Sequence, residues 1–150
     1  MATFYRIVQA EWAVSAMTGE GARLFGGRWN PPGVPAVYLA ESRALAALEI
    51  VVHAPREAMR LEWCLIEVEV PDKWIELPGR EDLPVDWQAL PSSPGARSYG
   101  GKWLKTGALA LSLPSVVIPE ESTLLLNPQH PQAGGLKVSK PQEFRFDPRF

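Results

Sequence analysis

The chain has 150 residues, with 15 Lys and Arg against 17 Asp and Glu, so its formal net charge is −2. A hydrophobic fraction of 46% with 21% charged residues excludes intrinsic disorder, and the length predicts one domain, residues 1–150. Fifteen prolines disfavour a helical bundle, because proline is excluded from helix interiors and central strands. Short elements and stiff loops are therefore expected.

Charge and cysteine content also limit the partners and the compartment. No run of basic residues supplies the positive face that nucleic-acid binding needs, so no direct nucleic-acid partner is expected. The single Cys64 excludes an intrachain disulfide, and no Cys/His cluster has zinc spacing, so no metal site is predicted. Met1–Glu11 lacks the apolar core of a signal peptide, and the apolar stretch Thr106–Pro119 is too short to span a bilayer. We therefore expect a cytoplasmic protein without a membrane partner.

Short apolar or alternating segments predict a series of strands. The segment Ile66–Val70 alternates strictly, as is typical of a half-solvated antiparallel strand. In chain order, the expected strands are Thr3–Val8, Pro35–Ala40, Leu61–Val70, Ala108–Leu113, Val116–Ile118, Thr123–Leu126 and Glu143–Phe146. One clear helix, Arg43–His53, follows Ser42 as N-cap and is ended by Pro55.

Two glycine- and proline-rich segments separate these elements. Gly19–Gly33 is expected to be a connector, and Leu77–Gly101 a long loop of the kind that forms lids or binding loops. One short helical turn is expected at Lys102–Thr106. Several short, mostly antiparallel strands with few helices predict an α+β fold.

A carboxylate in the predicted helix has an unusual position. Leu45, Leu48 and Val52 predict an inward stripe, and Glu49 lies on or beside it. A charged carboxylate there is costly unless it is paired or faces a polar cavity. Glu49 therefore either pairs with His53 at i+4 or belongs to a polar site, and the sequence leaves both interpretations open.

Two further segments have candidate functional side chains. The adjacent glycines of Gly26–Asn30 allow a ligand to approach the backbone, and Arg28 can hold a phosphate or carboxylate by two hydrogen bonds. The alternative is a tight turn with a surface arginine. Ser115 lies between prolines without a G-x-S-x-G elbow, so a hydrolase nucleophile is not indicated. It could simply satisfy a backbone group, as His130 could be an ordinary loop residue.

In order and spacing, these segments resemble the RES domain, the toxin component of a bacterial toxin–antitoxin family named for arginine, glutamate and serine. The matching segments are Tyr5-Arg6, Gly26–Asn30, Val37–Ala40, Ala47–Glu49, Gly101–Leu104, Pro114–Pro119 and Leu126–Pro131. One departure is Thr123, where the family pattern has an asparagine. The resemblance implies a fold like that of the ADP-ribosyltransferase toxins, NAD+ as substrate, and an Xre-type helix-turn-helix antitoxin as inhibitor and partner.

The resemblance also implies which residues act. The name-giving residues would be Arg28, Glu49 and Ser115, with Tyr38 a further active-site position. Glu49 would steady the positive charge on the ribose, Tyr38 would stack on the nicotinamide, and Arg28 would grip the pyrophosphate or a ribose hydroxyl. Ser115 would orient Glu49 or a ribose hydroxyl. The remaining substrate-binding candidates are the backbone of Gly26 and Gly27, for the carboxamide, and the side chains of Arg6, Asn127 and His130.

Three functions remain open at this point. The leading one is degradation of NAD+ by hydrolysis or phosphorolysis, and its nearest alternative is transfer of ADP-ribose to a protein. The third is a non-catalytic nucleotide- or partner-binding module. No Rossmann G-x-G-x-x-G motif is present, so NAD+ is expected to be consumed, with no other cofactor. Six tryptophans suggest an interface near Trp74 or Trp87, with the antitoxin or in a homo-oligomer.

Overall fold

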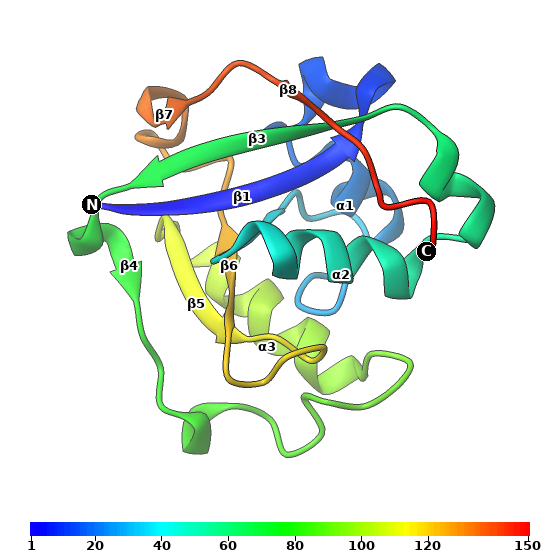
Figure 1. The fold of residues 1–150 in the computed structure, drawn as a ribbon. Coiled ribbons are helices and arrows are strands. Elements are labelled where there is room, and N and C mark those ends of the chain that lie inside the picture. The colour runs from blue at the N-terminus through cyan, green and yellow to red at the C-terminus, as the bar shows by residue number, and fades with distance from the viewer.

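The computed structural model describes residues 1–150 and contains one curled sheet of short strands (Figure 1). The strands are β1 (Ala2–Gln9), β2 (Val37–Ala40), β3 (Trp63–Val70), β4 (Ile75–Glu76), β5 (Ala110–Pro114), β6 (Ser122–Leu126), β7 (Lys137–Val138) and β8 (Gln142–Phe144). Their order is β4-β5-β6-β2-β1-β3-β7, and β8 also pairs with β3. Only β4 and β5 pair in parallel, so the expected mostly antiparallel α+β fold is confirmed.

Three α-helices accompany the sheet: α1 (Glu20–Phe25), α2 (Arg43–His53) and α3 (Pro94–Lys105). In Figure 1, α2 runs alongside β1, and it packs on both β1 and β2. No helix is both long enough and apolar enough to span a bilayer.

Most expected strands are confirmed, with ends displaced by a few residues. The exception is Val116–Ile118, which forms no strand. After β5 the chain turns back at once, because the Ser115 amide donates to the carbonyl of Glu121 and the Glu121 amide donates to that of Ile118. The apolar run is thus a tight turn between β5 and β6.

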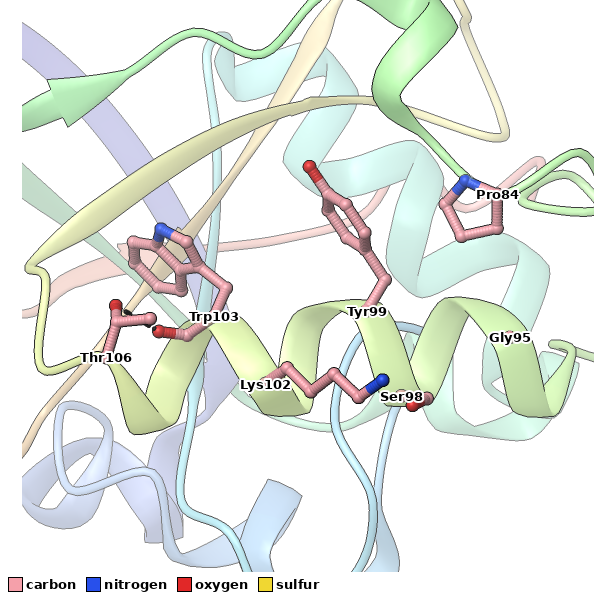
Figure 2. A pocket seen from close by; sticks show the side chains of 7 residues that line it. All are labelled: Pro84, Gly95, Ser98, Tyr99, Lys102, Trp103 and Thr106. Carbon is pink, nitrogen blue, oxygen red and sulfur yellow. Dashed lines mark hydrogen bonds between the residues drawn. The ribbon is translucent and has the colours of Figure 1, made fainter.

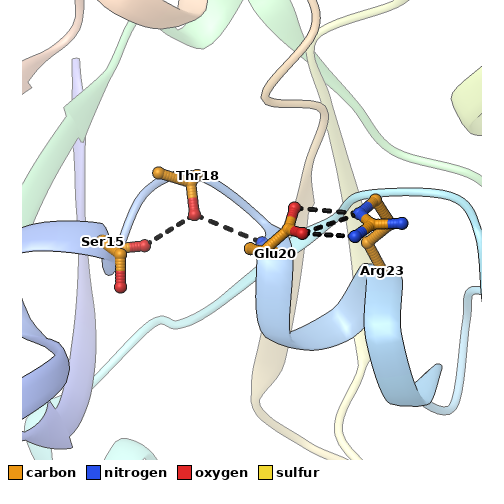
Figure 3. Close-up of polar contacts among 4 residues, drawn as sticks. All are labelled: Ser15, Thr18, Glu20 and Arg23. Atoms are coloured by element: carbon orange, nitrogen blue, oxygen red, sulfur yellow. Dashed lines mark hydrogen bonds and ion pairs between the residues drawn. The ribbon is translucent and has the colours of Figure 1, made fainter.

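The expected connector Gly19–Gly33 contains helix α1, so that prediction is wrong in its middle. Gly19 and Gly26 flank the helix with φ of 75° and 74°, values that favour glycine. The Thr18 hydroxyl donates to the Ser15 carbonyl at 2.8 Å and accepts from the Glu20 amide at 3.3 Å. Glu20 and Arg23 form an i,i+3 ion pair along the helix (Figure 3). The glycines end this helix rather than prevent it.

The expected loop Leu77–Gly101 ends earlier than predicted, because its last residues belong to α3. Ser93 caps the helix by accepting a hydrogen bond from the Ala96 amide at 3.0 Å, and Pro94 occupies the first turn. Proline is tolerated in the first turn of a helix. The loop was predicted from its prolines and glycines, and that prediction did not allow for this position. The turn expected at Lys102–Thr106 is largely the last turn of this longer helix.

The predicted N-cap of α2 is confirmed, but its predicted inward stripe is rotated. The Leu45 amide donates to the Ser42 hydroxyl at 3.0 Å. Leu45 and Ala46 are buried, whereas Val52 is 56% exposed. Leu45 and Ala46 belong to one hydrophobic cluster and Ile50 packs against it, so the buried face is centred between Leu45 and Ile50. Glu49 lies between Leu45 and Ala46 on the helical wheel, within that face.

Three hydrophobic clusters fill the space between the sheet and its helices. The cluster beside α3 includes Trp29, Leu104, Leu111 and Trp87. Trp87 is only 8% exposed, so its expected place at an interface is wrong. Trp74 packs partly buried against the cluster on β1 and β6.

Candidate active site

The sheet opens between β1 and β2. These strands pair only at Tyr5 and Ala40, whereas β1 pairs with β3 along its whole length. Arg6 fills the opening, and its Nη1 donates to the Tyr38 carbonyl at 3.0 Å. Burial lowers the pKa of Arg6 to about 10, so the guanidinium stays charged at neutral pH. Its Nε is buried and has no hydrogen-bond partner within the protein.

Glu49 and Ser115 are joined by a hydrogen bond between α2 and the turn after β5. The Ser115 hydroxyl donates to Oε1 of Glu49 at 2.9 Å. It also accepts from the amides of Val117 at 3.0 Å and Ile118 at 3.2 Å. Because two backbone amides occupy the lone pairs of the hydroxyl oxygen, its remaining interaction is the hydrogen bond that it donates to Glu49. Ser115 is therefore a fixed donor to the carboxylate.

The second oxygen of Glu49 remains accessible. Its Oε2 is 3.7 Å from Nε2 of His53, and the Glu49 side chain is 29% exposed. The sequence offered two interpretations of this carboxylate, a His53 pair or membership of a polar site, and the structure contains both contacts. Glu49 is thus held on one side and open on the other.

Arg28 extends from the glycine turn toward the long loop. The turn is closed by the Gly27 amide, which donates to the Asn30 carbonyl at 3.0 Å. Nη1 of Arg28 donates to the carbonyls of Trp87 at 3.0 Å and Ala89 at 2.7 Å. Partial burial lowers the pKa of Arg28, and the nearby negative charge of Glu49 opposes that shift. Nε and Nη2 donate to no protein acceptor, so one side of the guanidinium can still bind an anion.

The hydroxyl of Tyr38 is fixed inside the protein. It donates to Oδ1 of Asn30 at 2.5 Å and accepts from the Trp29 amide at 3.1 Å. Burial raises the pKa of Tyr38, so the phenol stays neutral. A Cβ at Gly27 would lie 2.7 Å from this hydroxyl, which requires glycine there. Tyr38 can therefore offer its ring to a ligand, but not its hydroxyl.

The backbone of the glycine turn is less available than the sequence suggested. The Gly26 amide donates to the Ala22 carbonyl at 2.7 Å, and the Gly27 amide is used within the turn. Only carbonyl oxygens of this pair could meet a carboxamide, by accepting from its NH2 group.

Two predicted binding residues lie among other contacts. Asn127 is 3% exposed, and its Nδ2 donates to the carbonyls of Ala108 at 3.0 Å and Leu104 at 3.3 Å. These bonds tie the end of β6 to the last turn of α3 and to the segment before β5. The His130 ring packs edge-on against Trp74 at 5.3 Å, and its Nδ1 accepts from the Gln132 amide at 2.9 Å. None of these contacts involves Glu49, Ser115 or Arg28.

Asn30 is a contributor that the sequence did not single out. It is completely buried, and its Nδ2 donates to the carbonyls of Ala22 at 2.9 Å, Val34 at 2.9 Å and Pro31 at 3.2 Å. It therefore positions both the glycine turn and the Tyr38 hydroxyl. The signal was present in the Asn-Pro pair after the glycines, because such pairs favour turns.

An open pocket lies along α3 (Figure 2). Its lining residues are Pro84, Gly95, Ser98, Tyr99, Lys102, Trp103 and Thr106. None of the predicted site residues lines it, and the lining contains no carboxylate. This pocket is therefore not the candidate site, which we place at Glu49, where the carboxylate is hydrogen-bonded to Ser115 and its negative charge acts on Arg28.

Fold and site together define a small α+β protein in which a glutamate is hydrogen-bonded to a serine and its charge acts on an arginine of a glycine turn. The sequence model of the RES domain matches residues 3–147, and the chain belongs to the RES domain family. The family resemblance noted in the sequence is confirmed.

Two curated relatives match almost the whole chain. The chain is 43% identical over 153 residues to the Prs ADP-ribosylating toxin of Sphingobium sp. (strain YBL2), covering 98% of this chain and 95% of that protein. It is 40% identical over 147 residues to Toxin Res of Yersinia enterocolitica, covering 97% of each.

A third relative is MbcT of Mycobacterium tuberculosis, named NAD(+) phosphorylase. Its sequence is 58% identical over 36 residues, or 23% of this chain and 19% of that protein. The crystal structure of the MbcT–MbcA toxin–antitoxin complex aligns with a TM-score of 0.75 at 24% identity, covering 96% of this chain and 84% of that chain. This likeness supports the same fold.

Proposed function

We propose that the chain is a toxin that cleaves the bond between nicotinamide and ribose in NAD+. The observation that carries the proposal is the Glu49 carboxylate held by Ser115 with one oxygen open. Cleavage of this glycosidic bond passes through a positively charged, oxocarbenium-like ribose. Nicotinamide leaves as a neutral molecule, so the reaction needs a nearby negative charge more than a strong acid.

The surrounding side chains would bind the rest of the dinucleotide. Arg28 has Nε and Nη2 free to hold the pyrophosphate or a ribose hydroxyl, and Arg6 adds a second cation. The ring of Tyr38 would stack on the nicotinamide. We propose no further cofactor, since NAD+ itself is the substrate.

In the leading version of this proposal, ADP-ribose passes to water or phosphate, which depletes the NAD+ of the cytoplasm. A cell carrying such an activity needs an inhibitor. The structural neighbour is a toxin bound to its antitoxin, which supports an antitoxin partner for this chain. We propose that this partner is an Xre-type helix-turn-helix protein.

A second candidate is transfer of ADP-ribose to a protein. It is favoured by the name of the Sphingobium relative, an ADP-ribosylating toxin. Both candidates break the same bond and differ only in the nucleophile that reaches the ribose.

Nicotinamide release from NAD+ by the purified chain tests the proposal, with and without phosphate. Fast release without any protein acceptor supports degradation, whereas release that requires an added acceptor protein supports transfer. Binding of NAD+ without release by either route would leave only the non-catalytic module.

A further inference from the structure

His53 lies one helical turn beyond Glu49 on the open side of its carboxylate. Nε2 of His53 is 3.7 Å from Oε2 of Glu49, while Oε1 is bonded to Ser115. The imidazole is 72% exposed, and neither ring nitrogen has a hydrogen bond within the protein. A separation of 3.7 Å is too long for a direct hydrogen bond, but a single oxygen atom can lie about 2.8 Å from both atoms.

We propose that His53 is a further catalytic residue, which accepts the proton of the nucleophile that attacks the ribose. This inference rests on the proposed cleavage of NAD+. An imidazole nitrogen can accept a proton in general base catalysis, and the imidazolium that forms would face the negative charge of Glu49. The pair would thus act on the nucleophile while the other oxygen of Glu49 stays fixed by Ser115.

The proton balance depends on the nucleophile. When water attacks C1′ of the ribose, the bond from C1′ to the nicotinamide nitrogen breaks, and its electron pair leaves with neutral nicotinamide. A C1′–O bond forms, and the extra proton of the water passes to Nε2 of His53 and then to solvent. A phosphate dianion attacks through an oxygen that has no proton, so phosphorolysis does not need His53.

This dependence separates a catalytic role from a structural one. An exposed i,i+4 pair contributes little to helix stability. A merely structural pair would therefore affect hydrolysis and phosphorolysis alike, and only slightly.

The experiment measures nicotinamide release in phosphate-free buffer and in the same buffer with excess inorganic phosphate. His53→Gln keeps a side-chain amide that can bond to Glu49 but cannot accept a proton at neutral pH. Val52→Gln, on the exposed neighbouring position, is the matched control for a glutamine at this end of the helix.

We expect His53→Gln to lower the release in water at least tenfold and to leave the phosphate-dependent increase within twofold of wild type. If phosphate does not increase nicotinamide release by the wild type, the tenfold loss of release in phosphate-free buffer is the test by itself. Hydrolysis within twofold of wild type, or equal losses with both nucleophiles, would overturn the inference. Failure of the proposed function gives a different result. The wild type would then release no nicotinamide, or Glu49→Gln would release as much nicotinamide as the wild type.

Discussion

Two turns of this protein place a buried polar side chain directly after a strand and beside a proline. Ser115 follows β5 and Asn127 follows β6, and they are 1% and 3% exposed. Both polar side-chain atoms of Asn127 are hydrogen-bonded to backbone groups, those of Leu104, Ala108 and Gln129. The Ser115 hydroxyl instead donates a hydrogen bond to Oε1 of Glu49, and the second oxygen of this carboxylate has no hydrogen bond within the protein. The first turn is therefore hydrogen-bonded to the proposed catalytic carboxylate, whereas the second is hydrogen-bonded to the backbone around the end of α3.

The largest expected effect comes from removing the charge at Glu49. Glu49→Gln keeps the shape and can still accept a hydrogen bond from Ser115, but it cannot stabilise a cationic ribose. We expect nicotinamide release to fall about 1,000-fold, in line with the loss of a main electrostatic contributor. Thermal unfolding should stay within a few degrees of wild type. Retention of even a tenth of the activity would contradict the assignment of Glu49.

The next effect should fall on stability and not on catalysis. Asn127→Ala leaves the carbonyls of Leu104 and Ala108 without their side-chain donor and opens space in a packed region. We expect the free energy of unfolding to drop by about 2–4 kcal/mol, measured by urea titration. The KM for NAD+ of the folded fraction should not change. A raised KM for NAD+ with normal stability would show that Asn127 contributes to substrate binding.

Ser115→Ala should affect both properties, and in this it differs from Asn127→Ala. The amides of Val117 and Ile118 lose their acceptor, which we expect to cost about 1–2 kcal/mol of stability. Glu49 loses its fixed orientation, so kcat should fall about 10- to 100-fold with little change in KM. If Ser115 were instead the nucleophile, activity would vanish as completely as in Glu49→Gln.

The smallest effect is expected at the Tyr38 hydroxyl, which contacts only Asn30 and Trp29. Tyr38→Phe keeps the ring and should keep nicotinamide release within about threefold, at a stability cost of about 1 kcal/mol. A large loss of activity would show that the hydroxyl reaches the substrate.

The same variant also tests the burial of this phenol. Burial raises the pKa of Tyr38, so above pH 10 the unfolded chain loses the proton while the folded chain keeps it. The contribution of the Tyr38 phenol to the free energy of unfolding is therefore fully present below about pH 10 and declines above it. The stability difference between wild type and Tyr38→Phe should shrink as the pH rises from 9 to 11, as followed by urea titration.

Part of the fold could be predicted because the signal was local. The alternation at Ile66–Val70 and the Ser42 cap each depend on residues within a few positions of one another, and both are confirmed. The helices α1 and α3 were missed because their glycines and prolines lie at positions that helices tolerate, such as a flanking residue with positive φ or the first turn. Local composition does not distinguish those positions from a loop.

The site divides in the same way. The sequence by itself determined which side chains were available, namely a carboxylate beside an apolar face, an arginine on a glycine turn and a serine between prolines. Only the tertiary structure decided that Ser115 donates to Glu49, 66 positions away in the chain, and that Asn127 bonds elsewhere. The reason is physical: a buried polar group must find partners, and which partners lie within reach depends on how distant segments pack.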